Sequence, residues 1–107
     1  MKKSKNMVYK NTIETQELQL YIDNTRVLYY HKKQVEQMLA KKLNRGIYRN
    51  CEAWKAFYKV CNHATELYNK AFGYRFTTAE RYTVAVNMAN DFVKEGYLNE
   101  NSVSYSQ

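Results

Sequence analysis

Proline is absent from this chain of 107 residues, and glycine occurs only three times. All-β domains need frequent turns, which are usually made with Gly and Pro, so this composition argues against a β fold. A helical domain needs such residues only where helices end. The sequence therefore predicts an all-α protein.

Long apolar runs are also lacking. None approaches the ~18 residues of a membrane span. The basic start of the chain, residues 1–5, is not followed by the apolar stretch of a signal peptide. We therefore expect a cytoplasmic protein with no membrane association. The two cysteines, Cys51 and Cys61, are then expected to be free thiols in a reducing compartment.

Apolar residues make up 45% of the chain, and they recur at helical spacing in three ranges. These ranges predict a small bundle of three main helices near residues 24–45, 50–72 and 78–95. Helix stop signals follow each range, at Gly46, Gly73 and Gly96. The short connection after the first range predicts that the first two helices are antiparallel neighbours.

The helix starts are predicted from capping residues. Asp23 or Asn24 is expected to cap the first main helix and Asn50 the second. The run from Thr77 to Glu80 fits a capping box for the third. Residues 15–22 fit either a short helix or an extended segment.

A single helical domain is predicted over residues 13–97. A mobile basic arm is expected at 1–12 and a frayed tail at 98–107. The apolar stripes predict a common core. Its largely buried members are expected to be Trp54, Phe57, Cys61, Tyr68, Phe72, Val86 and Phe92.

Positive charge is concentrated in one part of the chain. Between Arg26 and Lys59 lie nine basic and two acidic residues, a net charge of +7 that equals the charge of the whole chain. Many of these cations fall on one side of the first main helix or near its end, where they also complement the helix dipole. We predict that this basic face contacts a nucleic acid or an acidic protein surface, the alternative being a solvated face without a partner. The basic face comprises Arg26, Tyr30, Lys33, Lys41, Lys42, Arg45, Tyr48 and Arg49.

Patterns for catalysis or metal binding are not found in the sequence. A zinc site would need Cys51, Cys61, His31 and His63, but no CxxC or HxxxH pair occurs. The two histidines are expected on separate faces and the acids are scattered, so no nucleophile with its base is predicted. We therefore expect a binding protein without cofactor or metal, and not an enzyme.

A helix-turn-helix made by the second and third helices is an alternative way to read DNA. Asn side chains on the third helix can recognise adenine. Against this arrangement, the connection of residues 73–77 is long, and Asp91 would face phosphates of like charge. The exposed side of the third helix is expected to carry Thr83, Asn87, Asn90, Asp91 and Lys94.

Several segments of the chain resemble a known group of sequences. Residues 18–24, Leu28-Tyr29, Lys41-Lys42 and residues 46–48 are similar to short helical open reading frames of phages and conjugative elements. The resemblance covers about residues 15–93. It implies an accessory protein of a mobile element, and it assigns no functional residue. Its further positions are Ala53, Lys55, Tyr58, Ala64, Tyr68, Phe72-Gly73, Phe76, Arg81 and Ala85.

Three hypotheses for the function follow. The first is a non-enzymatic accessory protein that binds a host nucleoprotein complex, for example an anti-CRISPR or other anti-defence inhibitor. The second is a DNA- or RNA-binding accessory or regulatory protein with weak sequence specificity. The third is a structural homodimer with Tyr at its self-interface. Salt dependence separates the second from the others, and a concentration-dependent mass separates the third.

Overall fold

The computed structural model describes the backbone of residues 11–106 and the side chains of residues 11–95. Two threonines stand at the start of its first described helix. Helix α2 spans Ile13–Asn24. The Thr15 N–H donates to the Thr12 hydroxyl at 3.1 Å, and the Thr12 N–H donates to the Thr15 hydroxyl at 2.7 Å. This reciprocal cap pairs N–H groups that a helix start leaves without partners. The segment 15–22 is therefore helical and not extended.

A single residue separates α2 from α3, which spans Arg26–Asn44. Thr25 has an extended backbone, with φ −107° and ψ 115°, and is both the C-cap of α2 and the N-cap of α3. The predicted cap at Asp23 or Asn24 is wrong, because both lie inside α2. The Asp23 carboxylate instead forms an ion pair with Lys32 at 2.8 Å.

Two glycines end helices as predicted. Helix α4 spans Asn50–Phe72 and ends at Gly73, whose φ of +73° is the left-handed conformation that favours glycine. Gly46 follows α3 with a φ of +74°. The N-cap of α4 is Arg49 and not the predicted Asn50, which is already the first helical residue.

Helix α5 spans Thr78–Ser106 and starts with the predicted capping box. The Glu80 N–H donates to the Thr77 hydroxyl at 3.1 Å, and the Thr77 N–H donates to the Glu80 carboxylate at 2.9 Å. The predicted stop at Gly96 is wrong, because α5 continues through it. A single glycine inside a helix costs only about 1 kcal/mol relative to alanine, so it does not by itself end one.

The arm predicted at the start of the chain falls largely outside the described residues, and so do the side chains of the predicted tail. Of the arm expected at residues 1–12, the structure describes only Asn11 and Thr12. Of the tail expected at residues 98–107, it describes the helical backbone as far as Ser106.

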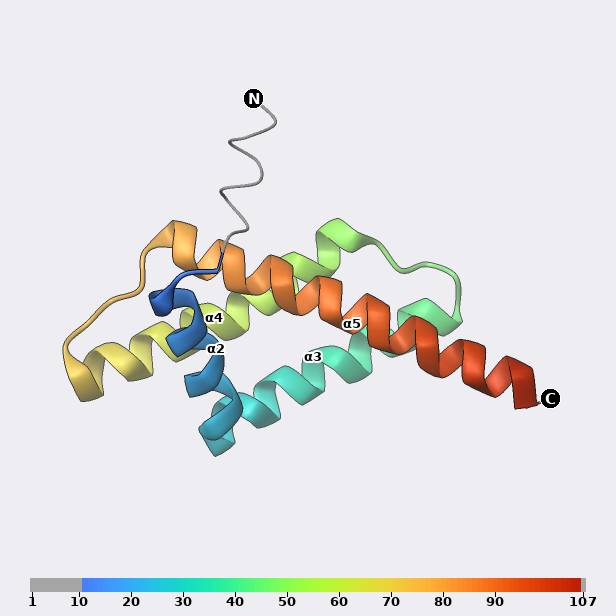
Figure 1. Cartoon of the computed structure of the whole chain (residues 1–107), viewed down its shortest axis with the longest axis horizontal. Coiled ribbons are helices and arrows are strands. Elements are labelled where there is room, and N and C mark those ends of the chain that lie inside the picture. Colours follow the sequence, from blue (N-terminus) through green and yellow to red (C-terminus); the bar gives the residue numbers. More distant parts are fainter. Residues whose placement is uncertain (1–10, 107) are drawn as a thin grey trace, which may run out of the picture.

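The helices cross in two layers around a shared core. Helix α5 crosses in front of α4, and α3 runs beside α4 in the opposite direction (Figure 1). Helices α4 and α5 make the most extensive contact, and α2 packs against all three others. In the described part of the chain the fold is all-helical, with one helix more than predicted because α2 is separate from α3. None of the described helices is long and apolar enough to cross a membrane.

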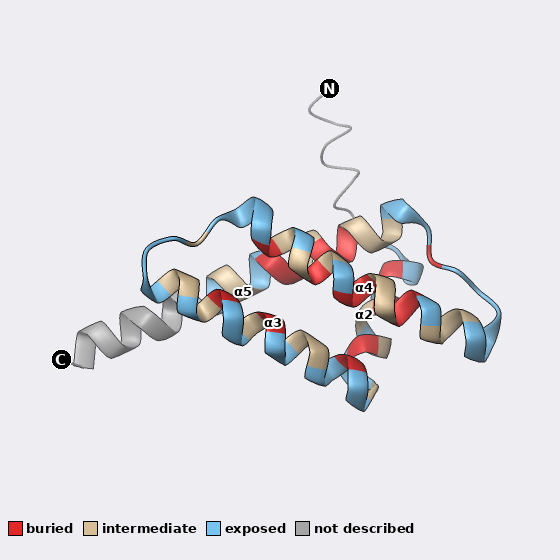
Figure 2. Cartoon of the chain, turned by 180° about the vertical axis from the view of Figure 1, so that it is seen from behind, coloured by how far each residue is buried: buried red, intermediate tan, exposed pale blue. Residues whose placement is uncertain are grey.

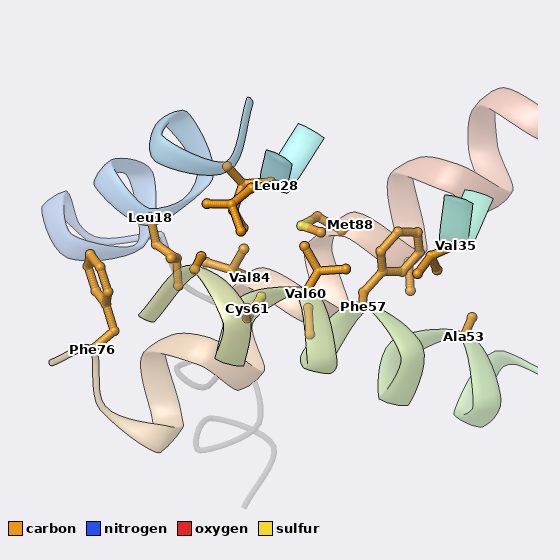
Figure 3. Close-up of a cluster of buried hydrophobic side chains, with 14 of the residues drawn as sticks. Leu18, Leu28, Val35, Ala53, Phe57, Val60, Cys61, Phe76, Val84 and Met88 are labelled. Atoms are coloured by element: carbon orange, nitrogen blue, oxygen red, sulfur yellow. The ribbon is translucent and has the colours of Figure 1, made fainter. Parts of the chain in front are cut away.

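Each of the four helices has buried residues (Figure 2), and their side chains meet in the core (Figure 3). Small residues of α4 and α5, such as Ala64 and Ala85, are fully buried and let these two helices approach closely. Phe76, in the connection before α5, is also buried and packs near Leu18 of α2. Every buried side-chain nitrogen and oxygen among the described residues has a hydrogen-bond partner. The buried apolar residues are Leu18, Ile22, Leu28, Val35, Leu39, Ala53, Phe57, Val60, Cys61, Ala64, Phe76, Val84, Ala85, Met88 and Ala89.

The predicted core is correct in its centre and wrong at its edges. Phe57 and Cys61 are fully buried, whereas Phe72 is 65% exposed. Helix α4 is about 34 Å long, and its apolar stripe continues past the helices that pack on it. Phe72, in the last turn, lies against the rings of Tyr68 at 4.6 Å and of Tyr21 in α2 at 6.3 Å. The remaining predicted members are half-buried: Trp54, Tyr68, Val86 and Phe92.

Candidate nucleic-acid or partner interface

The outer side of α3 carries the first half of the basic face. Arg26, Tyr30, Lys33 and Lys41 all lie on this exposed side, because steps of three or four residues return to the same side of a helix. The Tyr30 ring is 64% exposed. The predicted spacing therefore produces a surface on which cations and one open aromatic ring alternate.

Two cations of the basic face are neutralised by nearby acids. Lys33 pairs with Glu36 at 3.2 Å, which raises the pKa of Lys33, and Lys42 pairs with Glu52 at 3.1 Å. Glu36 and Glu52 are the only acids between Arg26 and Lys59. The other cations of the basic face have no ion-pair partner among the described residues: Arg26, Lys41, Arg45 and Arg49.

Three of these cations gather where α3 ends and α4 begins. Arg45 is the C-terminal cap of α3 and Arg49 is the N-terminal cap of α4, and both are exposed. Lys41 lies one turn before Arg45, whose N–H donates to its carbonyl at 3.1 Å. The connection between α3 and α4 thus presents a local excess of positive charge.

Tyr48 does not present its ring to a ligand as expected. The ring is half-buried and stacks on Phe92 of α5, with centroids 6.0 Å apart and planes 29° apart. Burial also raises the pKa of its hydroxyl. Tyr48 therefore anchors the connection to α5, and Tyr30 is the open ring of the basic face.

An aromatic groove lies between α4 and α5, beside the basic face. Its volume is about 850 Å³, and most of the surface that its lining residues expose to it is apolar. The Trp54 indole stands edge-on to two tyrosine rings, with centroids 4.9 Å from Tyr82 and 6.2 Å from Tyr58. We define the aromatic groove by its lining residues, which are Trp54, Lys55, Tyr58, Lys59, Asn62, Thr78, Ala79 and Tyr82.

Two lysines form a ridge between the aromatic groove and a second hollow. Lys55 and Lys59 are exposed, lie one turn apart on α4, and line both hollows. The second hollow, of about 380 Å³ between α3 and α4, also contains Lys42 of the basic face. The lysine ridge therefore links the basic face to the aromatic groove across one side of the molecule.

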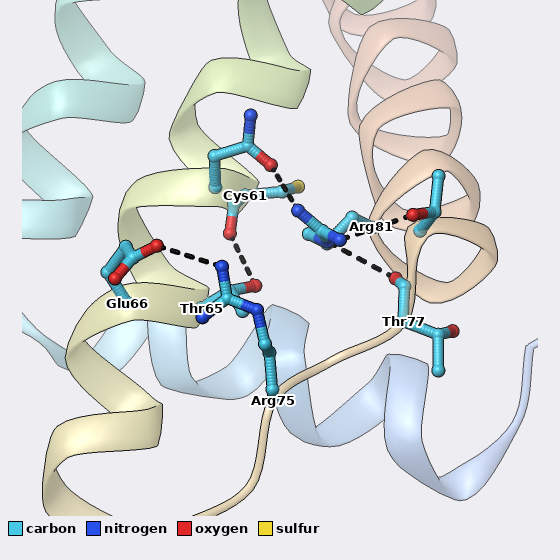
Figure 4. Close-up of polar contacts among 8 residues, drawn as sticks. Cys61, Thr65, Glu66, Arg75, Thr77 and Arg81 are labelled. Carbon is cyan, nitrogen blue, oxygen red and sulfur yellow. Dashed lines mark hydrogen bonds and ion pairs between the residues drawn. The ribbon is translucent and has the colours of Figure 1, made fainter.

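Arg81 fixes the wall of the aromatic groove (Figure 4). Its guanidinium donates to the Asn62 amide oxygen of α4 at 2.8 Å and to the Thr77 carbonyl before α5 at 3.3 Å. It also lies 5.8 Å from the centre of the Tyr58 ring, within the range of a cation–π contact. Arg81 thus holds α4, the start of α5 and one aromatic wall in a fixed relation.

The two histidines contact each other, so the expectation that they lie on separate faces is wrong. The Nδ1 atoms of His31 in α3 and His63 in α4 are 3.1 Å apart. Burial first, and then the neighbouring His63 ring, lowers the pKa of His31 below its ordinary value of 6.5. A helical wheel describes one helix at a time, so it does not predict that two boundary residues meet when α3 packs on α4.

Metal-binding side chains do not gather among the described residues, and the two cysteines differ in their surroundings. No group of three or more His, Cys, Asp or Glu side chains is close enough to bind a metal ion within this part of the chain. Burial raises the pKa of the Cys61 thiol to about 12, although Arg81 opposes the shift. Cys61 is therefore a protonated core residue, whereas Cys51 is exposed.

The structure corrects which residues lie on the exposed side of α5, the side that the helix-turn-helix alternative would use. Thr83, which was expected on the exposed side, is buried. Asn87 is half-buried, and its amide donates to the Asn11 side chain at 2.9 Å. Asn90, Asp91 and Lys94 remain exposed. Fewer side chains of α5 are therefore exposed for DNA recognition than the sequence suggested.

Sequence reasoning missed the aromatic groove, because Trp54, Tyr58 and Tyr82 follow the helical spacing that is equally typical of a core stripe. Lys55 and Lys59 adjoin these rings in the sequence, but lysines commonly flank the apolar stripe of a core helix, so they gave no distinct signal for the groove.

Comparisons with protein-family models, curated proteins and solved structures found no match to this chain.

Proposed function

We propose that this chain is a non-enzymatic accessory protein of a phage or mobile element, and that it binds a host nucleoprotein complex through its basic face. An anti-CRISPR or other anti-defence inhibitor would act in this way. The observation that carries the proposal is the charge of the basic face. Its two nearby acids are already paired, which leaves Arg26, Lys41, Arg45 and Arg49 without acidic partners among the described residues.

Exposed cations without counter-charges favour a partner that supplies negative charge. Their mutual repulsion lowers the stability of the free protein. A polyanionic partner surface relieves this repulsion and also increases the rate of association. Both the nucleic acid and the acidic protein surfaces of a nucleoprotein complex meet this need. The open ring of Tyr30 adds a residue type that is enriched at interfaces.

Direct binding of nucleic acid, with weak sequence specificity, is the second candidate function. One observation favours it: the lysine ridge stands beside three aromatic rings in the aromatic groove. Lysines that contact phosphates together with rings that stack on bases are typical of proteins that bind single strands.

The test compares two double variants that each remove two positive charges. Arg45→Ala/Arg49→Ala changes the basic face where α3 ends and α4 begins. Lys70→Ala/Arg75→Ala is the control near the other end of α4, where Arg75 forms an exposed ion pair with Glu66 at 3.0 Å that contributes little to stability. We expect the first variant to lose a host complex that the parent and the control both retain in a pull-down. A partner retained equally by both variants would refute the proposed role of the basic face.

A gel shift on DNA and RNA at two salt concentrations then separates the two functions. Direct binding predicts a salt-dependent shift, whose slope falls by roughly one unit for each phosphate that Arg45→Ala/Arg49→Ala no longer neutralises. A stable host complex without any shift supports the first function. Measuring the mass of the free protein at several concentrations tests whether it forms a homodimer.

A further inference from the structure

The aromatic groove leaves three large rings only half-buried at the surface of a small protein. Ligand sites are typically concave and lined mainly by apolar and aromatic side chains, with a few polar groups at defined places, and the groove has this make-up. Its volume of about 850 Å³ lies within the ~300–1,000 Å³ that is usual for ligand sites. The groove therefore has room for a flat aromatic group with its attached sugar.

The positive charge at the edge of the groove indicates that the ligand also carries negative charge. Lys55 and Lys59 lie at the rim, and neither has an ion-pair partner among the described residues. Positions four apart on a helix are about 5–6 Å apart at their Cβ atoms. Two ammonium groups thus lie along one side of an aromatic-lined groove, which suits a ligand that carries a flat ring and repeated negative charge.

From this juxtaposition we infer that the aromatic groove binds a segment of single-stranded nucleic acid. One base stacks against the rings of Trp54, Tyr58 or Tyr82, and the adjoining phosphates contact Lys55 and Lys59. This inference rests on the second candidate function, direct binding of nucleic acid, and it names the site and the form of the strand. A duplex is a poor ligand because its bases are stacked and paired inside the helix, whereas an unpaired base exposes its flat face.

The wall of the groove is held in place before any ligand arrives. Arg81 lies against Tyr58 and is itself bonded to Asn62 and Thr77, so it fixes that ring between α4 and α5. Trp54 is likewise held by its contacts with Tyr58 and Tyr82. Rings that are already ordered lose little conformational freedom when a base stacks on them, which favours binding.

Trp54 is the only tryptophan of the chain, so its fluorescence reports on the groove directly. The full chain is titrated with a short oligothymidine strand, with an abasic strand of the same length, with thymidine monophosphate and with a duplex. We expect the oligothymidine strand to quench the Trp54 emission at concentrations where the other three do not. A free mononucleotide that quenches as well as the strand would overturn the inference in favour of a small-ligand site.

Variants assign the binding to the groove. Tyr58→Ala should weaken binding of the strand by about 5- to 150-fold, and Tyr58→Phe should restore it because the ring is retained. Lys55→Ala/Lys59→Ala changes only exposed side chains, so it should fold as the parent does. It should lower the salt slope by about 1.4 units, at ~0.7 for each phosphate of a single strand. Lys70→Ala/Arg75→Ala is the charge-matched control and should bind as the parent does.

Failure of this inference is distinct from failure of the proposed function. If abasic strand and duplex bind as tightly as oligothymidine with no change in Trp54 emission, the groove is not the site, while the basic face remains one. If no strand binds but the host complex is captured through Arg45 and Arg49, the inference is overturned and the proposed function stands. If neither a strand nor a host complex is bound, both are overturned.

Discussion

Acid should destabilise this protein through the contact between His31 and His63. Their Nδ1 atoms are 3.1 Å apart, so one ring donates a hydrogen bond and the other accepts it. This arrangement requires one neutral ring, because a protonated histidine carries a hydrogen on both nitrogens and accepts nothing. Protonating both rings therefore removes the hydrogen bond and places two positive charges side by side.

The direction follows from the lowered pKa of His31. The unfolded chain binds this proton more readily than the folded chain does. Stability is therefore complete above the unfolded pKa of about 6.5 and is lost as the pH falls below it.

Two contributions determine how much stability is lost. Loss of the hydrogen bond costs about 1 kcal/mol. The ring centroids are 5.3 Å apart, and two charges at that distance repel by about 1 kcal/mol in water. Both rings are only half-buried, so water screens this repulsion, and the total loss should be about 2 kcal/mol between about pH 8 and about pH 5. For a domain of this size, that corresponds to a fall in Tm of roughly 8–16 °C.

Thermal unfolding across this pH range is the assay, and His31→Gln/His63→Gln is the control. The chain contains only two histidines, and carboxylates titrate mainly below this range. The double variant should therefore have a nearly constant Tm between about pH 5 and about pH 8. A parent protein whose Tm stays constant, or rises as the pH falls, would refute the reasoning.

Three further predictions concern the core and the helix ends. Phe57 is fully buried, so Phe57→Ala should lower the free energy of unfolding in urea by about 3–5 kcal/mol, and a change below about 1 kcal/mol would contradict its place in the core. A thiol reagent should modify one cysteine of the native protein, the exposed Cys51. Modification of Cys61, buried with a pKa of about 12, should require unfolding, and two equally fast thiols would contradict that burial. Gly73→Ala should cost about 1–2 kcal/mol in the same urea assay because φ is +73° there, and an unchanged or raised stability would contradict the left-handed end of α4.

Local signals predicted the elements of this fold well. The glycines at 46 and 73 and the capping box at Thr77 act within a few residues, so their chemistry can be read without knowing the fold. The same reasoning failed at Gly96, where a stop signal was present but α5 continues. It also left α2 undecided, because Thr12 and Thr15 cap each other through hydroxyls and not through the usual Glu or Gln.

Tertiary packing determined what local signals did not predict. The helical spacing of apolar residues in α4 predicts one continuous buried surface from Trp54 to Phe72, but neighbouring helices cover only its middle. Its ends therefore became the half-buried wall of the aromatic groove and the exposed ring of Phe72. For the candidate site, helical spacing placed Arg26, Tyr30 and Lys41 together on one face. It did not predict that Tyr48 would reach Phe92 across the bundle.

The packing of α2 also determines when this protein is able to fold during its synthesis. Leu18 and Ile22 of α2 are fully buried, and α2 contacts both α4 and α5, which leave the ribosome much later. The amide of Asn87 reaches back to Asn11, 76 positions away. A nascent chain therefore leaves part of the apolar side of its first described helix exposed until α5 has emerged. The core should close in one late step, and not helix by helix as translation proceeds.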